Sequence, residues 1–338
     1  MLNRVGSSWL LASLALACLC PFTAFAQEKS EISIALQPGF PYMGALVMEK
    51  RGLIEKHAAQ LGLPNLKVKW PRFSGGGAQT DAMLAGAVDI VTPGAGNLLL
   101  LWDRTKGGVK GIAAISAQSL TLVSRNPAVK TLRDIGPTDK IAVPTVRVST
   151  QAVLLQMAAA NLFGPDQWAK FDANTVQLGH PDALAALSNS QHEVTSHFGA
   201  PPFTYFELKR VPGAHVVTDS TEIVGGPLTI AQFFTTTKFA EANPKAVQAI
   251  RDAAIEAGEF INKDPAAAIE VYREATQDKT DPGELLEALK QPGVLEYGAA
   301  PLGTMKFADH LFRTGVLKTK PKAWTDFYLP IAHDLNGS

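Results

Sequence analysis

The sequence predicts an α/β protein of two similar lobes, each built on a largely parallel sheet, and three observations support this prediction. Short apolar runs alternate with segments of helical period, which is typical of βαβ units. This order of strand, Gly/Pro turn and helix starts near residue 31 and again near residue 141. After residue 228 the chain is Ala-rich, with too little strand pattern to stand alone. We expect this tail to pack on the first lobe, which requires two chain crossings between the lobes.

Residues 1–26 have the pattern of a signal peptide. Arg4 precedes an apolar run from Trp9 to Leu19 that is too short to span a bilayer, and Ala24-Phe25-Ala26 matches an A-x-A cleavage site. Cleavage after Ala26 would leave 312 of the 338 residues, with 30 basic and 31 acidic side chains and a formal charge of −1. We therefore expect a periplasmic protein, exported across the inner membrane.

Both cysteines, Cys18 and Cys20, lie in the segment that this cleavage removes. The exported chain would then have no disulfide, thiolate nucleophile or cysteine metal ligand. Acylation of Cys18 is the alternative, although Ala15-Leu16-Ala17 is a poor match for the required motif. The charge near zero and the absence of basic runs with aromatics argue against a nucleic-acid partner. We expect a monomer. We also expect no second membrane-crossing segment, because Asp89 and Pro93 interrupt the remaining apolar stretch.

The first lobe is expected to begin with residues 27–121. Apolar alternation predicts strands over residues 31–36, 66–70, 88–91 and 111–116. Helices are expected over residues 43–51, 53–56 and 78–84, with a Leu-rich helix opening at residues 93–97. Gly52 and Gly86 stand where left-handed helix ends are expected.

The second lobe is expected over residues 122–228. Its strands are predicted over residues 120–124, 141–144, 176–178 and 193–198, and its helices over residues 151–161 and 183–187. We expect Asp182 to cap the second of these helices, and Asn189 to take the place that Gly86 has in the first lobe. The tail, residues 229–338, would return to the first lobe with an extended run to residue 237. Helices are then expected over residues 244–261, 264–276, 284–290 and 303–314.

Glycine-rich turns follow two consecutive predicted strands of the first lobe. Ser74-Gly75-Gly76-Gly77 follows the strand at residues 66–70, and residues 93–97 follow the strand at 88–91. Such turns bring backbone N–H groups and helix N-termini to the carboxyl edge of a sheet, where small polar or anionic ligands bind. The run lacks the Lys-Ser/Thr of a nucleotide loop, so triphosphate binding is not expected. We predict one wall of a ligand cleft at these turns.

Arg147 is the first candidate on the facing wall. It lies in a turn between a predicted strand and a helix, flanked by Thr145, Ser149 and Thr150. An arginine there could pair with a carboxylate or sulfonate while hydroxyl and N–H groups complete the shell. The alternative is a solvated arginine, with Thr145 or Ser149 only capping the helix.

Aromatic and amide side chains complete the predicted site. Phe40, Phe73, Phe198 and Phe203 are candidates for apolar walls, with ordinary core packing as the alternative, which is favoured for Phe198 because it lies inside a strand run. Amides at strand ends or crossings would hydrogen-bond a polar head group. The predicted ligand-binding residues are Gln37, Phe40, Phe73, Ser74, Gly75, Gly76, Gly96, Asn97, Gln118, Thr145, Arg147, Ser149, Thr150, His197, Phe203 and Gln232.

No metal, cofactor or catalytic residue is expected. His192-Glu193 resembles the start of an H-E-x-x-H motif, but His197 comes five positions after His192 rather than four. That spacing places the two imidazoles on different faces of a helix or strand. His197 could line the cleft or be a structural histidine.

Several segments resemble the extracytoplasmic solute-binding proteins of ABC importers, in particular the nitrate/sulfonate/taurine type related to thiamine-pyrimidine binders. They are QPGFPYMGALVMEKRGLIEK, FSGGGAQTDAMLAGAVDIVTPG, IAVPTVRVSTQ, VTSHFGAPPF and TGVLKTKPKAWTDFY. The resemblance implies a type II periplasmic-binding-protein fold: two α/β lobes, a two-strand hinge and a helical C-terminal tail on the first lobe. Glu193 stands where the pattern usually has Asp.

The resemblance also implies a function. The chain would capture a small organic solute, such as a sulfonate, a taurine-like molecule, a carboxylate or a heteroaromatic, and deliver it to an ABC permease and ATPase. An enzyme on the same fold is one alternative, but related pyrimidine synthases carry a Cys-rich motif and the mature chain has no cysteine. A sensor module for a signalling partner is the other.

Overall fold

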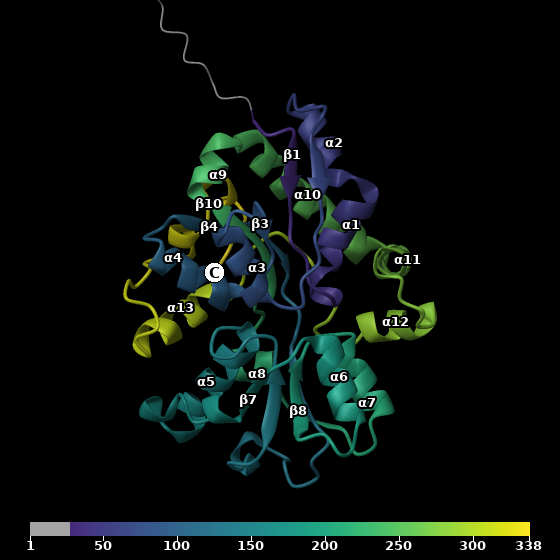
Figure 1. The fold of residues 1–338 in the computed structure, drawn as a ribbon, viewed down its shortest axis with the longest axis vertical. Coiled ribbons are helices and arrows are strands. Elements are labelled where there is room, and N and C mark those ends of the chain that lie inside the picture. Colours follow the sequence, from purple (N-terminus) through teal and green to yellow (C-terminus); the bar gives the residue numbers. More distant parts are fainter. Residues whose placement is uncertain (1–27) are drawn as a thin grey trace, which may run out of the picture.

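The computed structural model describes residues 28–338 and shows two α/β lobes, one above the other (Figure 1). The predicted signal peptide, with Cys18 and Cys20, lies outside the described residues. None of the helices within residues 28–338 is long and apolar enough to cross a membrane.

The sheet of the first lobe contains strands from both ends of the chain. Its elements are β1 (Glu31–Ser33), β2 (Lys67–Lys69), β3 (Ile90–Val91), β4 (Val109–Ser116) and β10 (Ala231–Thr236). β1 is parallel to β2, and a parallel bridge from Ile34 to Ile90 joins it to β3. β10 lies antiparallel between β3 and β4. The strand order across the lobe is therefore β2-β1-β3-β10-β4.

The second lobe repeats this arrangement. Its strands are β5 (Thr121–Ser124), β6 (Lys140–Val143), β7 (Thr175–Gln177), β8 (Val194–Gly199) and β9 (His215–Asp219), in the order β7-β6-β8-β5-β9. β6 is parallel to both neighbours, and β5 lies antiparallel between β8 and β9. β5 thus has the place that β10 has in the first sheet, so the two lobes share one topology, as the repeated sequence order predicts.

Helices flank both sheets (Figure 1). Those of the two βαβ regions are α1 (Met43–Arg51), α2 (Leu53–Gln60), α3 (Gly76–Leu84), α4 (Ala95–Arg104), α5 (Thr150–Phe163), α6 (His180–Ser188), α7 (Phe203–Arg210) and α8 (Ser220–Val224). Gly52 ends α1 with φ of 58° and Gly86 follows α3 with φ of 74°, both left-handed as predicted.

Two predictions about α6 are wrong. The helix begins at His180 with Gly179 as N-cap, so Asp182 lies in its first turn and is not its cap. Pro181 explains the earlier start, because proline fits the first turn of a helix, where its missing N–H costs no hydrogen bond. Asn189 has φ of −92° and ψ of 107°, which is extended rather than left-handed.

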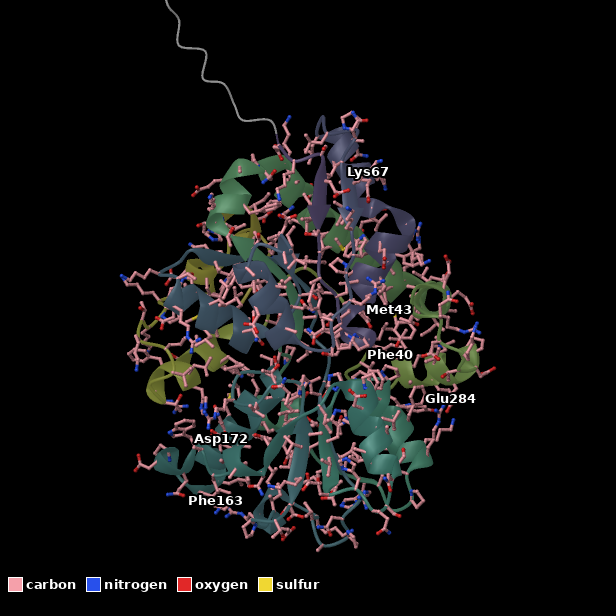
Figure 2. The ribbon with its side chains drawn as sticks, in the orientation of Figure 1. Phe40, Met43, Lys67, Phe163, Asp172 and Glu284 are labelled. Atoms are coloured by element: carbon pink, nitrogen blue, oxygen red, sulfur yellow. The ribbon has the colours of Figure 1, made fainter. Side chains whose placement is uncertain are left out.

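The tail packs mainly on the first lobe, as predicted. Its helices are α9 (Thr237–Ala242), α10 (Pro244–Lys263), α11 (Pro265–Thr276), α12 (Pro282–Leu289) and α13 (Thr304–Arg313). α10 lies against α1, α2 and β4, and its small apolar residues belong to the core cluster that contains Phe40 and Met43 (Figure 2). Near the C-terminus, the Leu329 N–H donates to the Gly111 carbonyl of β4 at 2.8 Å.

The chain crosses between the lobes at residues 117–120 and 225–230. Gln118, in the first crossing, is buried, and its Nε2 donates to the Tyr297 hydroxyl at 2.8 Å and to the Val294 carbonyl. The Tyr297 hydroxyl in turn donates to the Phe40 carbonyl at 2.8 Å. This network ties the hinge to the tail and to the turn after β1.

We predict that Tyr297→Phe destabilises the protein by about 1–3 kcal/mol, because it leaves the buried Phe40 carbonyl and a Gln118 N–H without this partner. Urea unfolding followed by circular dichroism would measure the loss. Tyr205→Phe is the control: it removes an exposed hydroxyl that donates to Glu287, and we expect a change below about 0.5 kcal/mol. Equal effects of the two substitutions would contradict the role given to Tyr297.

Candidate functional site

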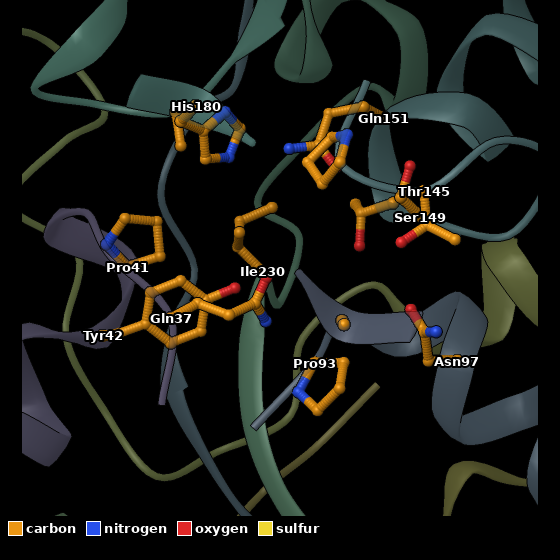
Figure 3. A pocket seen from close by; sticks show the side chains of 15 residues that line it. Gln37, Pro41, Tyr42, Pro93, Asn97, Thr145, Ser149, Gln151, His180 and Ile230 are labelled. Atoms are coloured by element: carbon orange, nitrogen blue, oxygen red, sulfur yellow. The ribbon is translucent and has the colours of Figure 1, made fainter. Parts of the chain in front are cut away.

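A pocket lies between the lobes where the first turns of α3, α4, α5 and α6 meet. Residues of the second lobe face residues of the first lobe across it (Figure 3). Its lining residues are Gln37, Pro41, Tyr42, Gly76, Pro93, Gly94, Asn97, Pro144, Thr145, Ser149, Thr150, Gln151, His180, Ala200 and Ile230. The cavity measures only about 20 Å³, which is room for about one water molecule. A larger solute therefore requires the lobes to move apart.

Three of the four helices begin at a glycine N-cap. Gly75, Gly94 and Gly179 precede α3, α4 and α6, and none of these helices has a side-chain cap hydrogen bond. The first N–H groups of a helix have no partner within the helix, so those that are not bonded elsewhere remain available to an acceptor in the pocket. The fourth helix, α5, is capped by the Ser149 hydroxyl, which accepts from the Ala152 N–H at 3.3 Å.

The backbone of the α4 N-terminus lies directly against the second lobe beside the pocket. A β-carbon at Gly96 would overlap the Val148 carbonyl oxygen, and one at Gly94 would overlap Thr150 Oγ1. Only glycine permits α4 to approach the start of α5 this closely. Across the same gap the Gly77 N–H donates to Thr145 Oγ1 at 3.3 Å. This arrangement is the closed form of the cleft.

Six of the predicted residues line the pocket, and they come from both lobes. They are Gln37, Gly76, Asn97, Thr145, Ser149 and Thr150. Thr150 Oγ1 is buried and has no hydrogen-bond partner among the described residues, so it is one of the polar groups that a solute could engage.

Three further predicted residues lie beside the pocket. Ser74 and Gly75 line an adjacent cavity of about 190 Å³, which shares Pro144 and Thr145 with the first. Phe203 does not line the pocket itself, but its ring stacks on that of the lining residue His180, with centroids 5.7 Å apart.

The remaining predicted residues do not line the pocket. Phe40 is fully buried in the core, edge-on to Tyr272 at 5.0 Å. Phe73 packs half-buried against the second core cluster, and Gly96 makes the interlobe contact. Gln118 supports the hinge, and Gln232 accepts a hydrogen bond from the Tyr328 hydroxyl inside the first sheet.

Arg147, the first candidate on the facing wall, does not line the pocket. It has φ of 67° and an exposed side chain, outside the lining residues. Its positive charge acts instead on Asp172, where it opposes the rise in pKa that burial of that carboxyl causes. Asp172 lies in the second lobe (Figure 2).

Three lining residues, His180, Tyr42 and Gln151, are not among the predicted ones. The predicted helix begins only at residue 183, whereas the Gly-His-Pro order after a strand is the signal that marks the helix start at residue 180. Burial and the neighbouring His197 hold the pKa of His180 well below its usual value, so the ring is neutral. Burial also raises the pKa of Tyr42, which keeps its phenol protonated.

His197 is fully buried behind the pocket. Its ring joins His180 to Glu207, with nitrogen-to-nitrogen and nitrogen-to-oxygen distances of 2.8 and 2.6 Å. In the described part of the chain, no three His, Cys, Asp or Glu side chains are grouped so as to hold a metal ion. The lining contains no Asp, Glu, Lys or Arg, so the pocket is a neutral site rich in hydrogen-bond donors.

Two lobes of equal topology, joined by two crossings and closing on a pocket of helix N-termini, define the type II periplasmic-binding-protein fold. The chain belongs to the NMT1-like family, whose profile matches residues 26–274. No curated protein matches the sequence.

Solved structures share this fold. One is the alkanesulfonate-binding protein SsuA from Xanthomonas axonopodis pv. citri bound to MOPS, with a TM-score of 0.65 and 17% identity over 89% of this chain and 99% of that chain. The periplasmic aliphatic sulphonate binding protein SsuA from Escherichia coli has a TM-score of 0.62 and 18% identity, over 88% and 98%. The periplasmic nitrate-binding protein NrtA from Synechocystis PCC 6803 has a TM-score of 0.66 and 12% identity, over 88% and 84%. At these identities the likeness establishes the fold.

We predict that Gly96→Ala holds the lobes apart. The new methyl group would overlap the Val148 carbonyl, and relieving such overpacking costs about 1–3 kcal/mol of the closed form. Small-angle X-ray scattering should show a larger radius of gyration than that of the unchanged protein. Gly298→Ala is the matched control, because no atom lies within 4 Å of its added β-carbon. A scattering curve unchanged by Gly96→Ala would refute the proposed contact.

Proposed function

We propose that this protein captures a small organic solute between its lobes and delivers it to an ABC importer. The observation that carries this proposal is the pocket closed by both lobes and lined by four helix N-termini. Such a pocket can surround a solute, and opening at the hinge can release it unchanged. Solute binding by relatives of the same fold, an alkanesulfonate-binding protein and a nitrate-binding protein, supports the proposal.

The donors in the pocket favour a solute with an oxygen-rich head group, such as a sulfonate or carboxylate, or a heteroaromatic ring with carbonyl groups. Three uncapped helix N-termini contribute about 1–3 kcal/mol in all to an anion. A micromolar solute needs about −8 kcal/mol. The remainder must come from side-chain hydrogen bonds, from apolar contact with Pro41, Pro93 and Ile230, and from closure of the lobes.

The proposal extends to the location and partners of the protein. The chain would be exported, cleaved after Ala26 and work as a periplasmic monomer that presents its solute to a membrane permease with an attached ATPase. One lobe would comprise residues 27–121 and 229–338, and the other residues 122–228. The protein is then a carrier and not an enzyme.

We predict that a thermal-shift panel of alkanesulfonates, nitrate, aromatic carboxylates and pyrimidines contains a solute that stabilises the protein. A solute at 100 times its Kd should add about 2.7 kcal/mol to the free energy of unfolding. Mass spectrometry should then recover that solute unchanged. Chemical conversion of the solute would favour the enzyme alternative, and a panel without any stabilising member would count against the proposed solute classes.

We predict that Asn97→Ala weakens binding of the stabilising solute about tenfold, because it removes an amide that lines the pocket, worth about 1–1.5 kcal/mol. Isothermal titration calorimetry would measure the Kd. Arg147→Ala is the control and should leave the Kd within about twofold, since its side chain is exposed outside the lining. The reverse result would restore Arg147 as the residue that pairs with the solute.

A further inference from the structure

A chain of three buried side chains leads from the pocket into the second lobe. His180 begins α6, His197 lies on β8 and Glu207 lies on α7. His180 Nδ1 is 2.8 Å from His197 Nε2, and His197 Nδ1 is 2.6 Å from Glu207 Oε1. Their exposed fractions are 7%, 0% and 0%. Because His180 lines the pocket with its Nδ1 already engaged, its Nε2 is the nitrogen left for a solute.

This relay, Glu207–His197–His180, has two consistent sets of hydrogen bonds. In the first, the Glu207 carboxylate accepts from His197 Nδ1–H, and His197 Nε2 accepts from His180 Nδ1–H. His180 Nε2 then carries a lone pair and acts as an acceptor, since a neutral imidazole has one donor and one acceptor nitrogen. The relay as a whole carries one negative charge.

In the second set the relay holds one more proton. The proton enters from solvent at His180 Nε2, and the proton of His180 Nδ1 moves to His197 Nε2. His197 now has both nitrogens protonated, and its positive charge lies beside the Glu207 carboxylate. His180 stays neutral in both sets, but its Nε2 has changed from an acceptor to a donor, and the relay has no net charge.

The surroundings of the relay bear on where the charge of the added proton lies. Glu207 Oε2 is buried and has no hydrogen-bond partner among the described residues, so the singly negative relay leaves part of a carboxylate uncompensated. The start of α6 disfavours a positive charge on His180 itself, which directs the charge inward to His197. The ring is held closely, because a β-carbon at Gly199 would lie 2.6 Å from His197 Cε1.

Among the described residues, no other titratable side chain is hydrogen-bonded or ion-paired to the relay. Tyr42, across the pocket, stays protonated because burial raises its pKa. The titratable and charged side chains on the neighbouring elements are exposed or partly exposed. They are Lys140 at the start of β6, Asp182 on α6, Tyr205, Lys209 and Arg210 on α7, and Glu284 and Glu287 on α12. Lys209 and Arg210 are paired with Glu284.

We propose that the Glu207–His197–His180 relay couples the binding of an anionic solute to the uptake of one proton, by making His180 Nε2 a donor. This inference rests on the proposed function, since it assumes a solute in the same pocket. An acceptor oxygen at His180 stabilises the protonated relay, so the affinity is highest below the pH at which the relay titrates. Above that pH the Kd rises up to tenfold for each pH unit.

The relay can be tested first without any solute. Spectra of the ¹⁵N-labelled histidine rings between pH 5 and 9 should show His180 Nε2 changing from protonated to unprotonated as the pH rises, while Nδ1 changes in the opposite sense. His180→Gln identifies the signals among the seven histidines. A His180 ring that keeps one tautomer throughout, or that becomes doubly protonated, would overturn the relay.

Coupling to a solute is then measured with methanesulfonate as the probe. Calorimetry in buffers of different ionisation enthalpy should show that about one proton is taken up on binding, at pH values above that at which the relay titrates. Glu207→Gln keeps the shape of the side chain but cannot ionise, so the uptake should fall to about zero. Glu193→Gln, exposed at the start of β8, should retain it. Binding with no proton uptake at any pH would refute the coupling and leave the solute-binding function standing.

Two further results separate the remaining cases. If Glu207→Gln fails to fold, His197→Gln replaces it, because it also separates His180 from Glu207 and should abolish the proton uptake. The ¹⁵N histidine spectra of the unchanged protein test the relay without either variant. If methanesulfonate does not bind, the result contradicts both the anionic solute class of the proposed function and the coupling of its binding to proton uptake. A tautomer change of His180 in the spectra would then be a property of the second lobe that is independent of solute binding.

Discussion

The cleft depends on an unusually close contact between the backbones of the two lobes. Gly94 and Gly96 at the start of α4 lie against Thr150 and the Val148 carbonyl at the start of α5, where no β-carbon would fit. This contact gathers helix N-termini around one small space. N-termini carry partial positive charge and unpaired N–H groups, so their gathering is unfavourable unless an acceptor lies between them. The glycines that let the lobes close therefore also define what the pocket prefers to hold.

The hinge follows from the way the chain is shared between the lobes. β5 comes directly after the first crossing and β10 after the second, and each is inserted antiparallel inside the sheet that it enters. Each crossing is therefore anchored by a strand inside a sheet, which leaves only a few residues between the two sheets to serve as a hinge. Gln118 and Tyr297 bind the first crossing to the tail, which makes the C-terminal helices part of the hinge support and not an appendage.

Much of this architecture could be predicted from the sequence, because strand and helix periods and glycine helix ends are local properties. The turns at residues 74–77 and 93–97 were found in this way, and with them Gly76 and Asn97 of the pocket. Other predicted site residues do not line the pocket. Gln118 lies in a crossing and Gln232 near a strand end, as expected. Their amides, however, are hydrogen-bonded to Tyr297 and Tyr328, which are distant in sequence.

The sequence by itself determined the α/β class, the repeated lobe, the helical tail and the position of the glycine-rich turns, since all of these follow from neighbouring residues. Only the tertiary structure decided which side chains meet at the cleft. Arg147 has a left-handed backbone and an exposed side chain, and His180 is connected to Glu207 through His197 because α6 and α7 pack against β8. Side-chain direction at a turn and contact between distant elements depend on how the whole chain packs. A local sequence pattern carries no information about that packing.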